Sequence, residues 1–214
     1  ERLHKAVRHA NREIGLQVEG DPRYRGMGCT LVALTIVAAG AYWISVGDSV
    51  IWHYRQGRLS RLNADHSYGA VLDDLVALGQ MAAETAANSL DRNALTSALC
   101  GERIEHMDRN TQPLALAAGD YFLLASDGLL TLGEADIAAI LSGAPEPQAA
   151  ATALIRRLEE VNQPEQDNAS VQIIRCRSQR PHRAPHAHPV SPLRRAPRRW
   201  LVGLSLLILV LVLT

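Results

Sequence analysis

The chain has little cysteine, and the three cysteines that it has form no pattern. Cys29, Cys100 and Cys176 are scattered, odd in number and without Cys-x-x-Cys spacing. A disulfide framework and a structural zinc site are therefore not expected, and the composition fits a reducing cytosol.

Acidic residues are absent from Ser178 to the end of the chain, although the formal net charge of the whole chain is zero. Residues 1–177 carry 16 basic and 22 acidic side chains, whereas residues 178–214 carry six arginines. Residues 178–199 also hold five of the ten prolines, which predicts an extended linker that buries no core. Any catalytic site is therefore expected within residues 1–177.

The last segment, residues 200–214, is a run of 15 residues without charge. A buried core helix is one interpretation, but a helix apolar on every face has nothing to pack on after such a linker. We predict a transmembrane helix cut short at Thr214, because a full span needs about 20 residues. Four arginines precede it, so the positive-inside rule places residues 1–177 in the cytoplasm. Anionic lipid is the nearer partner for these arginines, and no nucleic-acid partner is expected.

The pattern in residues 1–177 predicts an α+β fold with antiparallel sheets. Apolar residues at helical spacing predict a helix over the first 15 residues, and two β-rich runs, 29–37 and 42–47, predict a hairpin. Two strand-like pieces follow about the Gln56-Gly57 turn. A helix over 70–87, a strand over 121–125, two helices over 134–141 and 149–161, and a closing strand over 170–176 complete the pattern. Runs of strands broken by helix pairs favour α+β over strict strand–helix alternation.

Three acids lie at the ends of predicted strands. Asp48 follows the strand "YWISVG", Asp127 follows "YFLLA", and Asp167 precedes "SVQII". Each alone is most simply turn chemistry. Together they can converge at one edge of a sheet sandwich, where carboxylate oxygens are the ligands that Mg²⁺ and Mn²⁺ prefer. Two such ions can activate a water and stabilise an in-line displacement at phosphorus.

At this point the sequence resembles the PP2C-type metal-dependent serine/threonine phosphatases in their bacterial form. The resemblance covers residues 1–177 and rests on five segments in the family's order. They read "GMGCTLVAL" (26–34), "VGDSVIWHYRQGRLSRLNADHS" (46–67), "NALTSALCG" (93–101), "LAAGDYFLLASDGL" (116–129) and "DNASVQII" (167–174). Cys29 replaces the family's serine and Ser97 its arginine.

The resemblance implies a four-layer αββα sandwich of two antiparallel sheets flanked by helices, without its first strands in this chain. It also implies a pair of Mn²⁺ or Mg²⁺ ions, with a third and weaker site, that hydrolyse phosphoserine or phosphothreonine through a metal-activated water. By position, Asp127 and Asp167 match carboxylates on one of the paired ions, and Asp48 matches the acid of the third site. Expected to support these acids are Ser126, Gly128, Asn168 and Gly47.

The chain departs from the family pattern at its beginning. It starts at Glu1, inside a predicted helix and without an initiator methionine, so we expect it to be a piece of a longer protein. The family's phosphate-binding arginine, its Glu-Asp pair and the aspartate that bridges both metals are not among residues 1–214. No catalytic residue is therefore assigned in this range, and the piece alone is expected to bind metal weakly and to lack activity.

Some acids near these segments are open to two interpretations. Asp65, in "ADHSY", can join an acidic rim or cap the segment that follows, and the cap is favoured. Asp73 and Asp74 fall on a predicted helix and are expected to be solvated, although the family's variable flap lies nearby.

Two functions follow from the resemblance. The first is a phosphatase tethered to the bacterial inner membrane by a single helix, acting on phosphorylated Ser/Thr proteins and opposing a cognate Ser/Thr kinase. The alternative is a pseudophosphatase that binds phosphoproteins or acts as a scaffold. Three retained carboxylates at one rim favour the enzyme.

Overall fold

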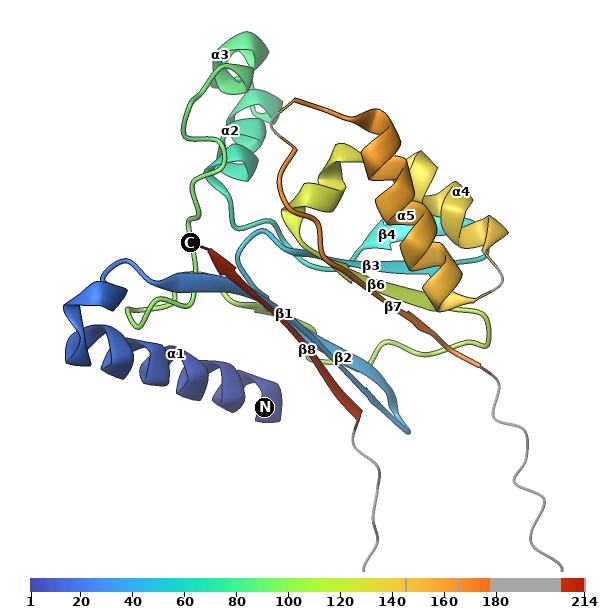
Figure 1. Cartoon of the computed structure of the whole chain (residues 1–214), viewed down its shortest axis with the longest axis horizontal. Helices are drawn as coiled ribbons and strands as arrows, with labels where there is room; N and C mark the ends of the chain where they lie inside the picture. The colour runs from blue at the N-terminus through green and yellow to red at the C-terminus, as the bar shows by residue number, and fades with distance from the viewer. Residues whose placement is uncertain (145, 165, 178–204, 214) are drawn as a thin grey trace, which may run out of the picture.

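The computed structural model of the protein has four layers: one helix, two antiparallel sheets and a pair of helices (Figure 1). The structure describes residues 1–144, 146–164, 166–177 and 205–213. The layers confirm the predicted α+β sandwich of two antiparallel sheets flanked by helices. The predicted linker, residues 178–199, lies outside the described residues.

The first sheet has the strand order β5-β2-β1-β8. Strands β1 (Gly28–Val37) and β2 (Gly40–Val46) form the predicted hairpin. Strand β5 (Asp108–Arg109) pairs with β2, and β8 (Ser205–Leu213) pairs with the other side of β1.

The second sheet has the order β4-β3-β6-β7, and every neighbouring pair is antiparallel. Its strands are β3 (Val50–Arg55), β4 (Arg58–Arg61), β6 (Tyr121–Ala125) and β7 (Val171–Arg175). Between β3 and β4 the chain turns at Gln56 and Gly57, which both have positive φ (50° and 84°), as a tight hairpin turn requires.

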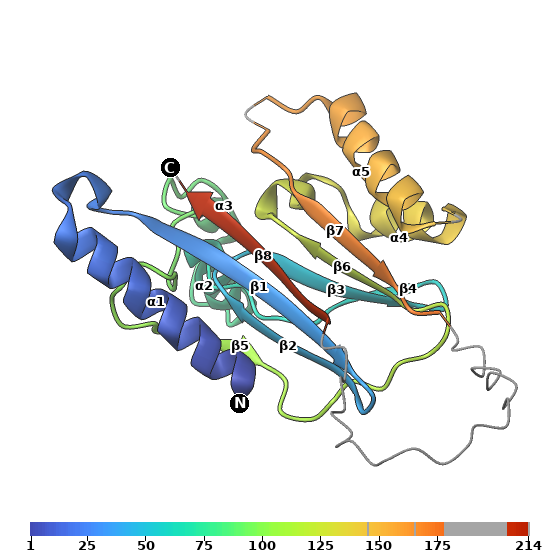
Figure 2. The ribbon, with the colours of Figure 1, turned by 60° about the horizontal axis from the view of Figure 1, so that its bottom comes forward.

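Alternation along the strands divides the core into three layers. Between the sheets, Leu34 of β1 packs in one cluster with Ile51 of β3 and Phe122 of β6. The outer face of the first sheet packs on α1 (Arg2–Gly20) through Val7. The outer face of the second sheet packs on α4 (Glu134–Gly143) and α5 (Pro147–Val161), as Figure 2 shows.

The predicted helix over 70–87 is wrong, because two helices stand in its place. Helix α2 (Tyr68–Ala77) ends before Gly79, and α3 (Ala83–Ala87) follows after a turn. Gly79 has φ +70°, a left-handed conformation that glycine adopts easily and that ends a helix. The two helices stand together at one end of the molecule (Figure 1).

The predicted transmembrane helix over 200–214 is wrong for Ser205–Leu213, which form strand β8. This segment is Leu, Ile and Val apart from one serine, so it can form a strand as readily as a helix. Its backbone pairs with β1 from Gly28 to Ile36, an edge that would otherwise leave its polar groups unpaired. Residues 200–204 and 214 of the prediction lie outside the described residues. Within the described part of the chain, no helix has the length and apolarity needed to cross a bilayer.

An ion pair between the buried Asp120 and the partly exposed Arg55 holds the start of β6 against β3. Asp120 is 1% exposed, and its carboxylate accepts hydrogen bonds from Arg55 Nε (2.8 Å), Arg55 Nη2 (2.6 Å) and Ala117 N (2.7 Å). Burial raises the pKa of Asp120, but the hydrogen bonds from Arg55 and Ala117 outweigh burial and lower it from 3.8 to about 2.

We therefore expect Asp120→Ala to lower the free energy of unfolding by about 2 kcal/mol, because it leaves the Arg55 Nε–H and the Ala117 N–H without their acceptor. The folded pKa lies below 3.8, so the contribution of Asp120 is complete above pH 3.8 and is lost as the pH falls through about 2. Urea denaturation followed by circular dichroism at several pH values measures both effects. As a control, Asp136→Ala removes an exposed partner of Arg157 and is expected to change stability by no more than about 0.5 kcal/mol. Equal losses in the two variants would contradict the expectation.

Candidate metal centre

The three acids predicted from the sequence lie in turns at the same end of the second sheet. In the antiparallel register, Val50 lies opposite Ala125, which lies opposite Val171. Asp48 comes two residues before β3, Asp127 two residues after β6, and Asp167 four residues before β7. Strand pairing alone therefore brings the three turns to one edge.

The turn that carries Asp48 is fixed by its glycine. Gly47 has φ +99°, and a Cβ there would lie 2.4 Å from Thr30 Cγ2, so no side chain fits. The Gly47 N–H donates to His66 Nδ1 at 3.1 Å, and Thr30 Oγ1 lies 2.8 Å from Ser49 Oγ. These contacts, in a buried environment, set the direction in which Asp48 leaves the sheet.

The segment of Asp127 is tied to the segment of Asp167 through Ser126. Ser126 Oγ donates to Asn168 O at 3.1 Å and accepts from Ser170 N at 2.9 Å. The Ser126 N–H also donates to Ser170 O at 3.0 Å. Ser126 is 2% exposed, so this clamp is shielded from water.

Gly128 allows the two segments to approach closely. A Cβ at Gly128 would lie 2.6 Å from Asn168 O and 2.9 Å from Asp167 O. Gln166 Nε2 donates to Gly128 O at 2.9 Å and closes the contact. The residues predicted to support the acids therefore lie around them, and each makes a contact that holds the edge together.

A cavity of about 200 Å³ opens at this edge. Its walls come from the end of the second sheet and from the α2 region. The lining residues are Asp48, Asp65, Ser67, Gly69, Ala70, Asp73, Arg92, Asn93, Asp127 and Leu130. Asp167 is exposed beside this cavity, within electrostatic reach of Asp127.

Burial and neighbouring carboxylates disfavour the charged forms of Asp48 and Asp127. Burial, and then the charge of Asp127, raise the pKa of Asp48 to about 6. Burial, and then the charge of Asp167, raise the pKa of Asp127. The charge of Asp65 adds to both shifts. A divalent cation bound here would offset this negative charge and make ionisation of the carboxylates more favourable.

The donors fit a hard divalent cation in chemistry, because they are carboxylate oxygens. They do not form a complete site: among the described residues, no three His, Cys, Asp or Glu side chains are placed to hold one ion. Asp48, Asp127 and Asp167 therefore share one edge without surrounding a common point.

Asp65 takes both of the positions considered from the sequence: it caps the segment that follows it, as favoured, and it also lines the cavity. Helix α2 itself is capped by Ser67, whose Oγ accepts from Ala70 N at 3.2 Å. The Asp65 carboxylate accepts from Ser67 N at 3.0 Å and faces the cavity. Asp73 is exposed, as expected, and it also pairs with Arg92. The position of Asp65 at the cavity could not be predicted from its spacing to the strand ends, because a loop brings it there.

Proteins of similar sequence and structure are phosphatases. In sequence, the chain is 34% identical over 116 residues to the protein phosphatase PhpP of Streptococcus pneumoniae, a match that covers 54% of this chain and 45% of PhpP. In structure, it matches the crystal structure of the Mycobacterium tuberculosis serine/threonine phosphatase PstP/Ppp with a TM-score of 0.66 and 31% identity, covering 80% of this chain and 69% of that one. A structure of the PstP catalytic domain in complex with two manganese ions matches with a TM-score of 0.59 and 30% identity, covering 76% and 64%.

The chain belongs to the PP2C-type serine/threonine phosphatase family. It spans less than half the length of the curated relative PhpP. No family model matches the chain.

The raised pKa of Asp48 predicts that this residue destabilises the metal-free fold. Its folded pKa of about 6 lies above 3.8, so the carboxylate opposes folding at neutral pH and ceases to do so below pH 3.8. In EDTA at neutral pH, Asp48→Asn is expected to raise the free energy of unfolding by about 1 kcal/mol, and this gain should disappear at about pH 4. Chemical denaturation measures it. Asp74→Asn, on the exposed side of α2, is the control expected to change little; a loss of stability in Asp48→Asn would count against the repulsion.

Gly128→Ala is expected to force the 166–168 segment away from Asp127, because its Cβ would overlap two carbonyl oxygens. We expect a loss of about 2 kcal/mol in stability and weaker Mn²⁺ binding, measured by thermal unfolding and by titration. Gly133→Ala is the matched control, since a Cβ there meets nothing within 4 Å. Equal behaviour of the two variants would show that the close approach does not position the acids.

Proposed function

We propose that this chain is part of the catalytic domain of a metal-dependent phosphatase that hydrolyses phosphoserine and phosphothreonine in proteins. The main supporting observation is that Asp48, Asp127 and Asp167 meet at one sheet edge, where burial and neighbouring carboxylates raise the pKa of Asp48 and of Asp127. Carboxylates that repel one another reduce stability, and a site that holds cations accounts for their presence. A scaffold without catalysis has no use for them, so the pseudophosphatase alternative is not favoured.

In this proposal Asp127 and Asp167 hold one of two paired Mn²⁺ or Mg²⁺ ions, and Asp48 belongs to a third, weaker site. When bound, such ions activate water and neutralise the charge of a phosphoryl group. The protein's own part is to hold the carboxylates ionised and oriented. Ser126 and Gly128 fix the Asp127–Asp167 edge, and Gly47 with His66 fixes the Asp48 turn.

Membrane attachment and opposition to a cognate kinase stay predictions from the sequence. The helix on which the tether depended is a strand over Ser205–Leu213, and the linker lies outside the described residues. Cytoplasmic placement at the inner membrane is likewise a prediction. Fractionation of cells that express the longer protein, with and without residues 178–214, would test it.

The activity is tested on the 214-residue chain and on the longer protein that contains it. With a phosphothreonine peptide and Mn²⁺, we expect rapid turnover by the longer protein and little by residues 1–214, because no three described side chains are placed to bind one ion. In the longer protein, Asp127→Asn should lower turnover by about 100-fold or more. Asp74→Asn, exposed on α2, is the control.

Two results would contradict these expectations, the first for residues 1–214 alone and the second for the phosphatase activity itself. Brisk turnover by residues 1–214 alone would show that the described carboxylates are a complete site. Failure of the longer protein to hydrolyse the peptide, with Mn²⁺ or with Mg²⁺, would remove the phosphatase assignment.

A further inference from the structure

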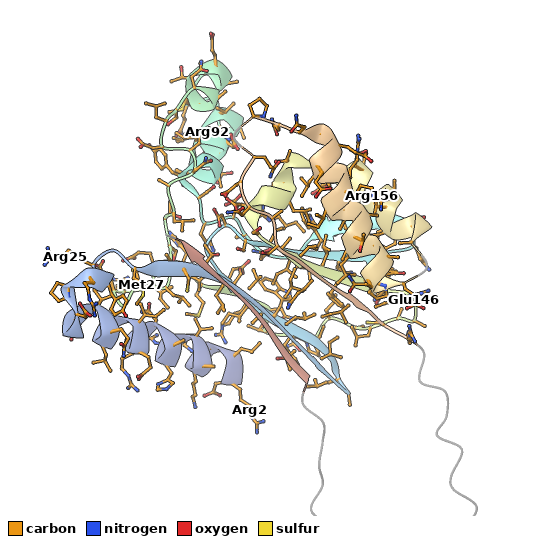
Figure 3. All side chains as sticks on the ribbon, viewed as in Figure 1. Arg2, Arg25, Met27, Arg92, Glu146 and Arg156 are labelled. Atoms are coloured by element: carbon orange, nitrogen blue, oxygen red, sulfur yellow. The ribbon has the colours of Figure 1, made fainter. Side chains whose placement is uncertain are left out.

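The cavity at the carboxylate edge has one positively charged wall. Among the side chains that line it in the described part of the chain, four are aspartates and Arg92 is the single cation. Arg92 comes from the loop that follows α3, on the α2 and α3 side of the molecule (Figure 3). Its side chain is 31% exposed, so its charge is within reach of a ligand in the cavity.

Three of the five N–H groups of Arg92 are engaged. Nη1 donates to Asp73 Oδ1 at 3.0 Å and to Ala86 O at 3.1 Å, and Nη2 donates to Asp73 Oδ2 at 2.9 Å. The Nε–H and the second Nη2–H make no hydrogen bond with the described residues. These two groups lie on the same side of the planar guanidinium, so together they form a fork for two oxygens of one anion.

The backbone of Arg92 is also held in place. Its carbonyl accepts from Gly69 N at 2.8 Å, at the start of α2. A Cβ at Gly69 would lie 3.0 Å from that carbonyl oxygen, so the approach depends on glycine. Asp73 fixes one side of the guanidinium, and the other side is left free without reorganisation.

We propose that Arg92 binds the phosphoryl group of the substrate through its Nε and Nη2 fork. The inference rests on the proposed function, which supplies a phosphate monoester as ligand. A dianion in a cavity with four aspartates needs a cation in addition to any metal ion, and Arg92 is the one that the described lining of the cavity offers. Asp73 opposes the anion while it orients the guanidinium, so it tunes the affinity downward.

The competing explanation is that Arg92 only fastens the loop to α2 and α3. The two explanations differ in what Asp73 does. If Arg92 is a fastener, Asp73→Asn and Arg92→Lys both loosen the loop and change phosphate binding in the same direction. If Arg92 binds phosphate, Arg92→Lys loses the fork and weakens binding, whereas Asp73→Asn keeps a hydrogen bond to Arg92, removes a negative charge and strengthens binding.

The experiment is a titration of the full chain with inorganic phosphate and with a phosphothreonine peptide, in the presence and absence of Mn²⁺, followed by calorimetry or ³¹P NMR. We expect Arg92→Lys and Arg92→Gln to bind phosphate about tenfold more weakly than the unchanged chain. Asp73→Asn should bind it about threefold more tightly. Arg157→Lys, which alters an exposed arginine paired with Asp136 on α4, is the matched control.

Equal affinity in Arg92→Lys and the unchanged chain would overturn the inference, and so would weaker binding by Asp73→Asn. Absence of phosphate binding by the unchanged chain with Mn²⁺ would overturn it as well. Thermal unfolding of each variant reports whether it folds. If Arg92→Gln does not fold, the phosphate affinities of Arg92→Lys and Asp73→Asn still distinguish phosphate binding by Arg92 from a purely structural role. Hydrolysis by the longer protein is measured separately, so that a failure of the phosphatase assignment and a failure of the Arg92 role are told apart.

Discussion

The constraint on which the site depends is the antiparallel register of β3, β6 and β7. Because Val50, Ala125 and Val171 lie side by side, the turns beyond them meet at one edge whatever their own sequences prefer. The register in turn depends on alternation: one face of these strands fills the space between the sheets, and the other packs on α4 and α5. A slip of one residue would move every buried side chain to the wrong face. The core therefore places the acids, and the acids contribute little to the core.

The edge is held together by the contacts of Ser126 and Gly128, and its carboxylates contribute no attraction of their own. Ser126 clamps the 168–170 segment through three hydrogen bonds, and Gly128 lets the chain approach within contact distance. These contacts are short and partly or wholly buried, so they offset the cost of burying and crowding the carboxylates, which raises the pKa of Asp48 and Asp127. Stability is thus reduced at the place where a cation is expected to bind, a common arrangement at functional sites.

How much the sequence predicted depends on the range of the interaction. Asp48, Asp127 and Asp167 were predicted because each lies at a strand end beside Gly, Ser or Asn. Turn residues and the burial pattern of a strand can both be recognised from a few neighbouring residues. Asp65 and Arg92 reach the same cavity through loops. Asp65 is held locally by Ser67, whereas the position of Arg92 depends on Asp73, which lies far away in the sequence. Gly79 indicates a possible break in the helix predicted over 70–87, but the amphipathic spacing on both sides of it favoured one continuous helix. Strand β8 was missed because apolarity does not distinguish a helix in a membrane from a strand at an open edge.

The distribution of charge around the cavity connects the metal-binding edge to the α2 and α3 region. On one side, carboxylates supply the negative charge that attracts divalent ions; on the other, Arg92 is neutralised in part by Asp73. An arginine without that partner would lie opposite Asp48 and Asp127 as a free cation and would compete with the metals for their charge. Pairing with Asp73 limits this competition and still leaves two N–H groups unengaged within the described structure. The same ion pair therefore lets one small cavity present an anionic surface to metal ions and a cationic fork to a phosphoryl group.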